Sequence, residues 1–197
     1  MAELVAAHPE LAAVVETWPD PPFWHRPPGF ATLVLFILEQ QVSLASARAA
    51  YERLQAEVGE VSPEPVVGLD DQTLRRIGFS RQKTRYTRAL AAAVLDRTLD
   101  LESISRAPDD DVRRALVVLP GIGPWTADVY LLSCLRRPDV WPVGDRALQV
   151  AAAEVLALDH VPDPTVLLDL GERWAPHRST AARLLWHAYL RRRGRNG

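Results

Sequence analysis

The 197-residue chain is predicted to be an all-α protein of about ten helices. Two observations predict this fold class. Apolar residues recur at helical spacing along most of the chain, and no segment alternates apolar and polar residues as a half-buried strand does. Glycine, proline and short polar residues stand at the ends of the apolar segments, where helices begin and end. Only residues 17–30, TWPDPPFWHRPPGF, are rich enough in proline to predict a linker.

The ends of several helices can be placed from single residues. Ser43 and Ser80 each precede a segment of helical periodicity and are predicted N-caps. Gly78 is predicted to end a short helix, and Pro124 suits a first helical turn, where its missing N–H costs no hydrogen bond. The segments predicted to be helical are 30–41, 44–58, 70–79, 81–97, 109–119, 124–135, 145–158, 164–174 and 179–193.

Composition indicates an ordinary globular protein of the cytoplasm. Hydrophobic residues make up 48% and charged residues 24% of the chain, and no uncharged apolar run is long enough to span a membrane. The N-terminus carries acidic residues within its apolar stretch, which argues against a secretory signal. A single cysteine, Cys134, excludes an internal disulfide and a four-cysteine iron–sulfur site.

The net charge of −2 gives no overall indication of nucleic-acid binding, but the charges are unevenly distributed. Residues 80–90, SRQKTRYTRAL, carry four basic side chains and no acid, and the tail RRRGR (191–195) is also basic. From charge alone, a solvated helix face and a basic tail remain the alternative to a binding surface.

The stretch LPGIGPWTADVYLL (119–132) predicts two helices joined by a very tight turn. Gly121 and Gly123 allow left-handed backbone or close approach to a ligand, and Ile122 between them suits the core. Such a turn presents backbone N–H groups at a helix start, where they bind anions such as phosphate. A tight connector without a ligand is the alternative.

Four motifs in order resemble the helix–hairpin–helix DNA glycosylase superfamily: ILEQQVSLASARAA, GFSRQKTRYTRALAAAV, LPGIGPWTADVYLL and RPDVWPVGDRAL. The resemblance covers residues from about 23 to 190 and is strongest to the alkylation-repair branch of 3-methyladenine DNA glycosylase II. It implies a two-lobed fold. Some members carry an extra N-terminal β domain, which we do not expect here because only about 30 residues precede the first motif. The expected parts are an N-terminal segment (1–30) packed with the C-terminal lobe, a central helical barrel lobe ending in the hairpin (31–137), and a C-terminal lobe (138–197).

The resemblance also implies an activity: hydrolysis of the N-glycosidic bond of alkylated purines, such as 3-methyladenine and 7-methylguanine, in damaged duplex DNA after base flipping. The expected enzyme is a monomer that needs no cofactor. It is not a lyase, because bifunctional relatives use a lysine where this chain has Trp125, and Lys83 is its only lysine. The alternatives are a glycosylase of the same fold for deaminated or oxidised bases, and a non-catalytic protein that binds DNA structures.

Asp145 stands at the position of the family's catalytic carboxylate. Breaking the bond between base and sugar places positive charge on the sugar, which a nearby carboxylate stabilises while it orients or deprotonates water. By position alone, a helix N-cap is the commonest role for such an aspartate, and both roles are compatible. Many relatives carry a second acid just before this position, where this chain has Gly144.

The remaining site residues follow from family positions. Trp125 is the leading candidate to stack on the flipped base, and a core tryptophan is the alternative. Gln41, then Gln40, match the intercalating position that fills the gap left by the base, with helix-end capping as the alternative. Further base-pocket candidates are Val129, Trp174, His177 and Trp24, and Tyr130 is a further cleft candidate. A surface histidine is the alternative for His177, and core packing is the default for Trp24 and Tyr130. Expected phosphate contacts come from Gly121, Ile122, Gly123, Arg81, Lys83 and Arg85. Hairpins of this type often bind Na⁺ or K⁺ through carbonyls, here those of Leu119 and Ile122.

Overall fold

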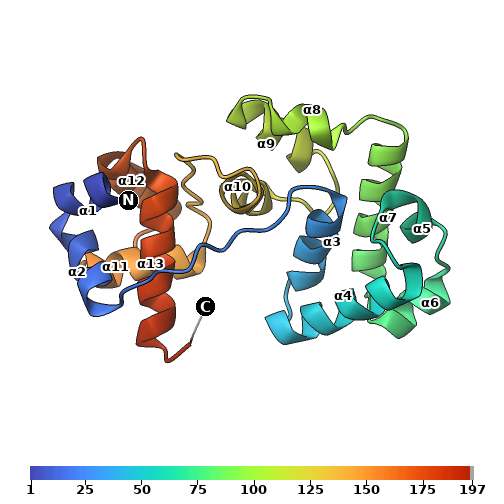
Figure 1. Ribbon diagram of the computed structural model, residues 1–197, viewed down its shortest axis with the longest axis horizontal. Helices are drawn as coiled ribbons and strands as arrows, with labels where there is room; N and C mark the ends of the chain where they lie inside the picture. The colour runs from blue at the N-terminus through green and yellow to red at the C-terminus, as the bar shows by residue number, and fades with distance from the viewer. Residues whose placement is uncertain (196–197) are drawn as a thin grey trace. The chain divides into compact units, whose positions relative to one another are not determined.

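The computed structural model describes residues 1–195, and all regular secondary structure in that range is helical (Figure 1). The elements are α1 to α13 and one short 3-10 helix, η1, so the all-α prediction is confirmed. In the described chain, no helix combines the length and apolar character needed to cross a bilayer. The chain divides into two compact units, which are described separately: unit 1 is Met1–His25 with the chain from Leu131 onward, and unit 2 is Arg26–Tyr130.

Unit 2 forms around α3, whose side chains are almost all apolar. Leu33, Val34, Ile37 and Leu38 on this helix are at most 1% exposed. Helix α3 packs against α4 and α7, while α6 contacts both α4 and α7 and α5 packs against α7. The helices of this unit are α3 (Phe30–Glu39), α4 (Leu44–Val58), α5 (Pro63–Val67), α6 (Asp71–Ile77), α7 (Arg81–Leu95), α8 (Leu101–Ser105), α9 (Asp109–Val117) and the first part of α10 (Pro124–Ser133).

The helix ends in unit 2 follow the predicted capping residues. The Ser43 hydroxyl accepts the Ser46 N–H at 3.2 Å, and the Ser80 hydroxyl accepts the Lys83 N–H at 3.2 Å. Gly78 has φ +112° and ends α6 in the left-handed conformation. All three predictions are confirmed. Helix α3, however, ends at Glu39, two residues earlier than predicted.

Unit 1 is organised around α13, which packs against α11 and α2 (Figure 1). Small residues on the two longer helices, such as Ala151, Ala152, Ala181 and Ala182, are fully buried and allow close approach. The elements of this unit are α1 (Ala2–Ala7), α2 (Pro9–Thr17), the end of α10, α11 (Arg146–Val155), α12 (Pro164–Gly171), η1 (Glu172–Trp174) and α13 (Arg178–Arg192).

Gly171 at the end of α12 is required by the close approach of an indole ring. A Cβ atom at Gly171 would lie 2.4 Å from Nε1 of Trp141. That Nε1–H donates to the Leu167 carbonyl at 2.7 Å, so the ring cannot move away without breaking a buried hydrogen bond. The contact fixes Trp141, which lies four residues before Asp145 in the chain.

Four helices were not predicted from the sequence: α1, α2, α5 and α8. Each has nine residues or fewer. Helices this short contain too few turns to produce a clear apolar period, and isolated helices of this length are not stable in water. Their formation therefore depends on packing against neighbouring elements.

Candidate functional site

Asp145 lies at the end of the turn between α10 and α11 and caps α11. Its Oδ1 atom accepts the Leu148 N–H at 2.7 Å, so the helix-cap interpretation is confirmed. The side chain is half-buried rather than enclosed. The positive end of the helix dipole stabilises a negative charge at this position. The cap thus holds a carboxylate in a fixed orientation at the surface of unit 1.

A second donor, which the sequence analysis did not identify, also holds this carboxylate. Trp186 on α13 donates its indole Nε1–H to Oδ1 of Asp145 at 3.1 Å. The ring of Trp24 packs edge-on against Trp186, with 6.4 Å between the ring centroids. The structure therefore brings together Asp145, Trp186 and the predicted pocket residue Trp24, which come from three distant parts of the chain.

The turn that carries Asp145 is anchored to the beginning of α13. Asp139 forms an ion pair with Arg178, at 2.7 Å, and Arg178 also pairs with Glu172. The hydrogen bonds from Arg178 hold the pKa of Asp139 below its usual value. The buried Ser179 hydroxyl accepts the Val140 N–H at 2.9 Å. These contacts fix the backbone just before Asp145.

Two predicted base-pocket residues lie near this anchor. His177 is half-buried and occupies the N-cap position of α13 without a side-chain capping bond. Trp174 is 0% exposed, and its ring packs edge-on against Trp141 with 5.2 Å between centroids. The prediction for Trp174 is wrong for this structure, because no face of the ring is accessible to a base. Its apolar bulk forms core instead.

The predicted hairpin between α9 and α10 is built around Gly121. This residue has φ +89°, and a Cβ atom there would lie 2.2 Å from Cδ2 of the Tyr86 ring. Both the left-handed backbone and the aromatic contact require glycine. Gly123 differs, since its φ is not in the left-handed region and no described atom lies within 4 Å of a Cβ built there. The two glycines therefore serve different purposes.

The hairpin amides are the candidate anion-binding groups. The Ile122 N–H donates inward to the Leu119 carbonyl at 3.1 Å, and the Ile122 side chain is buried. A phosphate contact from Ile122 is therefore a wrong prediction. Within the described residues, no backbone hydrogen bond is donated by the amides of Gly121 or Gly123. These two amides are the ones that remain suited to a phosphate.

The predicted monovalent cation suits the hairpin carbonyls chemically. The Leu119 oxygen accepts one hydrogen bond and retains a second lone pair, and such oxygens are ligands for hard cations. In residues 1–195, no group of three or more His, Cys, Asp or Glu side chains is arranged to hold a metal ion. The Na⁺ or K⁺ site stays a prediction.

The two helices of the hairpin are joined by an ion pair. Arg113 on α9 donates from Nε to Oδ1 of Asp128 on α10 at 2.7 Å. Burial raises the pKa of Asp128, and the Arg113 guanidinium opposes this shift. Because removing one partner would leave a largely buried charge, the pair fixes the register between the helices.

The two glutamines after α3 have different environments. Gln40 donates from its side-chain amide to the Gly121 carbonyl at 2.7 Å, so it binds the α3–α4 loop to the hairpin. Gln41 is exposed, with φ +57°. Of the two candidates for intercalation, Gln40 is therefore bonded to the hairpin, whereas Gln41 is exposed.

The basic residues of α7 point in more than one direction. Arg81 and Arg85 are exposed, and Arg85 lies over the Tyr86 ring with 5.3 Å from Cζ to the centroid. Lys83 instead donates to the Leu38 carbonyl at the end of α3, at 2.6 Å. Partial burial lowers the pKa of Lys83. Its ammonium group supports the α3–α4 loop, and its contact with phosphate stays a prediction.

The base-pocket candidates on α10 belong to unit 2. Trp125 lies in the first turn and is 39% exposed, which is high for a large aromatic ring. Val129, one turn later, is half-buried. Tyr130 is 0% exposed and accepts the Gly29 N–H at its hydroxyl, at 3.0 Å, so its prediction as a cleft residue is wrong. Stacking by Trp125 stays a prediction.

Comparisons with known proteins identify the family. The family model described as "HhH-GPD superfamily base excision DNA repair protein" matches residues 34–177. A putative DNA-3-methyladenine glycosylase of Bacillus subtilis, YfjP, is 33% identical over 160 residues, which are 77% of this chain and 56% of that protein. The chain thus spans little more than half the length of this curated relative.

Solved structures agree on the fold. A DNA-3-methyladenine glycosidase from Bacillus halodurans matches with a TM-score of 0.83 and 33% identity, covering 94% of this chain and 87% of that one. The 3-methyladenine DNA glycosylase Mag1 of Schizosaccharomyces pombe, solved with abasic DNA, also has a TM-score of 0.83, at 24% identity, covering 93% and 92%. The chain belongs to the HhH-GPD superfamily of base excision DNA repair proteins.

Proposed function

We propose that this protein is a monofunctional DNA glycosylase that removes alkylated purines from duplex DNA, with Asp145 as its catalytic carboxylate. The observation that carries the proposal is the fixed, half-buried carboxylate at the start of α11, held by two N–H donors. The relatives named as 3-methyladenine glycosylases support the choice of substrate.

The chemistry needs one carboxylate and one water. The bond between C1′ and the base nitrogen breaks, and its electron pair leaves with the base. The water oxygen bonds to C1′, and its proton passes to Asp145 or to solvent. At about 4 Å and an effective dielectric near 20, the carboxylate stabilises the cationic sugar by about 4 kcal/mol. An alkylated purine is already cationic and leaves without a general acid, so this modest contribution suits an alkylated base better than an intact one.

We expect hydrolysis without strand cleavage because of the residue that stands at the position of the family's nucleophilic lysine. Trp125 stands two residues after Gly123, where bifunctional enzymes of this fold carry the nucleophilic lysine. Lys83 is the only lysine and donates to the Leu38 carbonyl. We therefore expect an abasic site in an intact strand as the product.

The test is release of free base from methylated duplex DNA. Purified protein should release 3-methyladenine and 7-methylguanine, detected by chromatography, while the strand remains uncut until hot alkali is added. Release of uracil, hypoxanthine or oxidised bases in preference to methylated ones would support the alternative, a glycosylase for deaminated or oxidised bases. Tight DNA binding without release of any base would support the non-catalytic alternative.

Trp186 is proposed as a positioning residue for Asp145. Trp186→Phe keeps an aromatic ring against Trp24 and removes the N–H donor. Because a hydrogen bond to a charged group contributes about 1.5–3 kcal/mol, we expect base release to slow about tenfold to a hundredfold. Single-turnover rates at saturating enzyme isolate this effect from the affinity for DNA, which should not change.

Trp18→Phe is the matched control, because it makes the same substitution at a half-buried indole of unit 1 that lies against Arg192 and near Val155, at the end of α11 opposite to Asp145. Both variants should lose some thermal stability, but only Trp186→Phe should lose rate at a temperature where both are folded. Equal rates for the two variants would reject the positioning role.

Gln41 is proposed as the intercalating residue. Gln41→Ala should weaken binding to abasic-site DNA more than binding to undamaged duplex, because only the damaged duplex has a gap to fill. Gln40→Ala removes the hydrogen bond to the hairpin carbonyl and should weaken both equally. Fluorescence anisotropy with the two duplexes distinguishes the cases, and equal losses from Gln41→Ala would exclude this role.

A further inference from the structure

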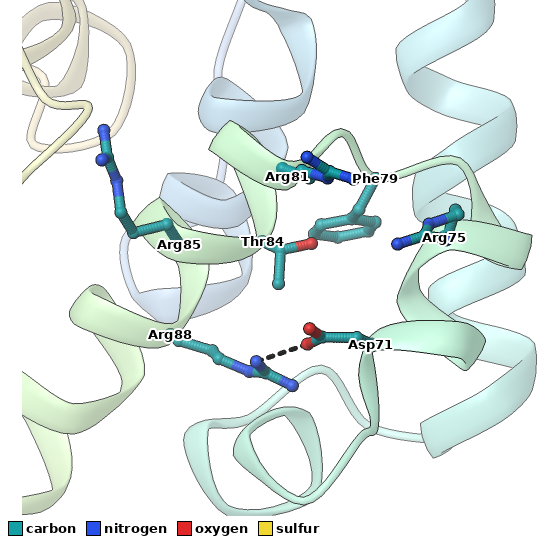
Figure 2. A pocket seen from close by; sticks show the side chains of 7 residues that line it. All are labelled: Asp71, Arg75, Phe79, Arg81, Thr84, Arg85 and Arg88. Atoms are coloured by element: carbon teal, nitrogen blue, oxygen red, sulfur yellow. Dashed lines mark ion pairs between the residues drawn. The ribbon is translucent and has the colours of Figure 1, made fainter.

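A strongly cationic hollow lies between α6 and α7 in unit 2 (Figure 2). It encloses about 380 Å³. We call it the arginine pocket, and its lining residues are Asp71, Arg75, Phe79, Arg81, Thr84, Arg85 and Arg88. Four arginines and one aspartate therefore line one hollow in a chain whose net charge is −2.

The four arginines are not equivalent. Arg88 pairs with Asp71 at 2.6 Å and donates to the Leu69 carbonyl at 2.8 Å, so it forms a fixed wall of the pocket. Arg75 and Arg81 are exposed, and no carboxylate of residues 1–195 pairs with either. Figure 2 shows both of these guanidinium groups on the same side of the pocket, near the ring of Phe79. Two uncompensated cations thus converge from two different helices.

The lining matches a phosphodiester better than an acidic peptide. Guanidinium groups bind phosphate oxygens through paired N–H donors, and the Thr84 hydroxyl adds a further donor in the pocket (Figure 2). Phe79 is the one apolar residue of the lining, and it is only 3% exposed. A peptide ligand would need apolar surface for its side chains, whereas a sugar–phosphate backbone needs mainly charge and hydrogen-bond donors.

The pocket is connected to the hairpin through α7. Arg85 lines the pocket, and its guanidinium lies over the Tyr86 ring. That ring in turn covers Gly121 of the hairpin. All of these residues belong to unit 2. From Arg81 to Arg88, seven residues of helix extend about 10 Å, or about three base-pair steps at 3.4 Å each. The wall that α7 contributes to the pocket is therefore long enough to follow about three phosphates of one strand.

We infer that the arginine pocket is a second phosphate-binding site, which holds the DNA backbone outside the segment bound by the hairpin. The inference rests on the proposed function for the identity of the ligand as DNA. It assigns a binding role to Arg75 and Thr84, which no sequence motif indicated, and joins them to Arg81 and Arg85. The site does not distinguish one DNA sequence from another, because phosphate contacts determine only the position and affinity of the DNA.

The test is the salt dependence of binding to an undamaged 30-base-pair duplex, measured by fluorescence anisotropy. Each lost phosphate contact lowers the slope of log K against log salt concentration by about 0.9. The double variant Arg75→Gln/Arg81→Gln should therefore reduce the slope by about 2 and weaken binding about tenfold or more at low salt. Both side chains are exposed, so the variant should melt at the wild-type temperature.

A matched control removes the same charge elsewhere in unit 2. Arg76 is next to Arg75 but pairs with Glu57 on α4, and Arg97 is exposed beyond the end of α7. Arg76→Gln/Arg97→Gln should leave the slope within about 0.5 of the wild-type value, because neither residue lines the pocket.

The outcomes separate this inference from the proposed function. A reduced slope for the pocket variant alone supports the site, even if the wild-type protein releases no base. Equal slopes for the pocket variant and the control overturn it, even if the wild-type protein releases methylated bases.

Discussion

Asp145→Asn is expected to slow the release of 3-methyladenine about a thousandfold, because it removes the charge that we propose stabilises the cationic sugar by about 4 kcal/mol. Asparagine preserves the size of the side chain and the oxygen that accepts the Leu148 N–H and the Trp186 N–H. It is also among the best helix N-caps. The fold and the affinity for undamaged DNA should therefore be unchanged, so that the reduced rate of base release can be attributed to the chemical step.

Asp163→Asn provides the control for this prediction. Asp163 caps α12 in the same unit by accepting the N–H groups of Thr165 and Val166, at 2.8 and 2.9 Å. The substitution makes the same chemical change at another helix start and should leave the rate within about twofold of wild type. Single-turnover release from methylated DNA measures both variants. An unchanged rate in Asp145→Asn would refute the catalytic assignment.

Gly121→Ala is expected to have the largest effect on stability, lowering the free energy of unfolding by about 2–5 kcal/mol. A left-handed backbone costs an L-residue about 1–2 kcal/mol, and the added Cβ would lie 2.2–2.8 Å from three atoms of the Tyr86 ring. Displacing that ring adds an overpacking cost of about 1–3 kcal/mol. Thermal and urea unfolding, followed by circular dichroism, measure the change.

Gly123→Ala tests whether the hairpin backbone approaches a DNA phosphate closely at this glycine. No described atom would contact the new Cβ, and the backbone there is not left-handed, so the variant should fold with nearly wild-type stability. If the backbone approaches phosphate closely at this glycine, affinity for duplex DNA should nevertheless fall. Equal destabilisation by the two alanine substitutions would contradict the different roles assigned to the two glycines.

Local features of the fold could be predicted because single residues determine them. Ser43, Ser80 and Gly78 specify helix ends through bonds to backbone groups three or four residues away. The hairpin was predicted for the same reason, since the order of proline and glycine fixes the turn. The end of α3 was misplaced because Gln40 is held by a carbonyl 81 residues away, which helical periodicity cannot reveal.

The site residues that were missed, and those that were wrongly predicted, depend on contacts between distant segments. Trp186 follows the apolar period of α13, and nothing in its local sequence indicates that its N–H reaches Asp145, 41 residues earlier. Trp174 and Tyr130 have the composition of pocket residues, but their burial is set by packing against Trp141 and Gly29. Arg75 belongs to a short helix whose partner surface is supplied by α7. A resemblance in motif order identifies the family, whereas these contacts require coordinates.

The most direct measurement of the central claim compares release rates of cationic and neutral bases from one position in one duplex. General acid catalysis contributes about 10²–10⁴ to the departure of a neutral base, and the mechanism assigned here uses a single carboxylate on the sugar side only. We predict that 7-methylguanine and 3-methyladenine leave at least about a hundredfold faster than hypoxanthine under single-turnover conditions, and that Asp145→Asn slows the release of both methylated bases about a thousandfold. Release of hypoxanthine as fast as the methylated bases would contradict the mechanism.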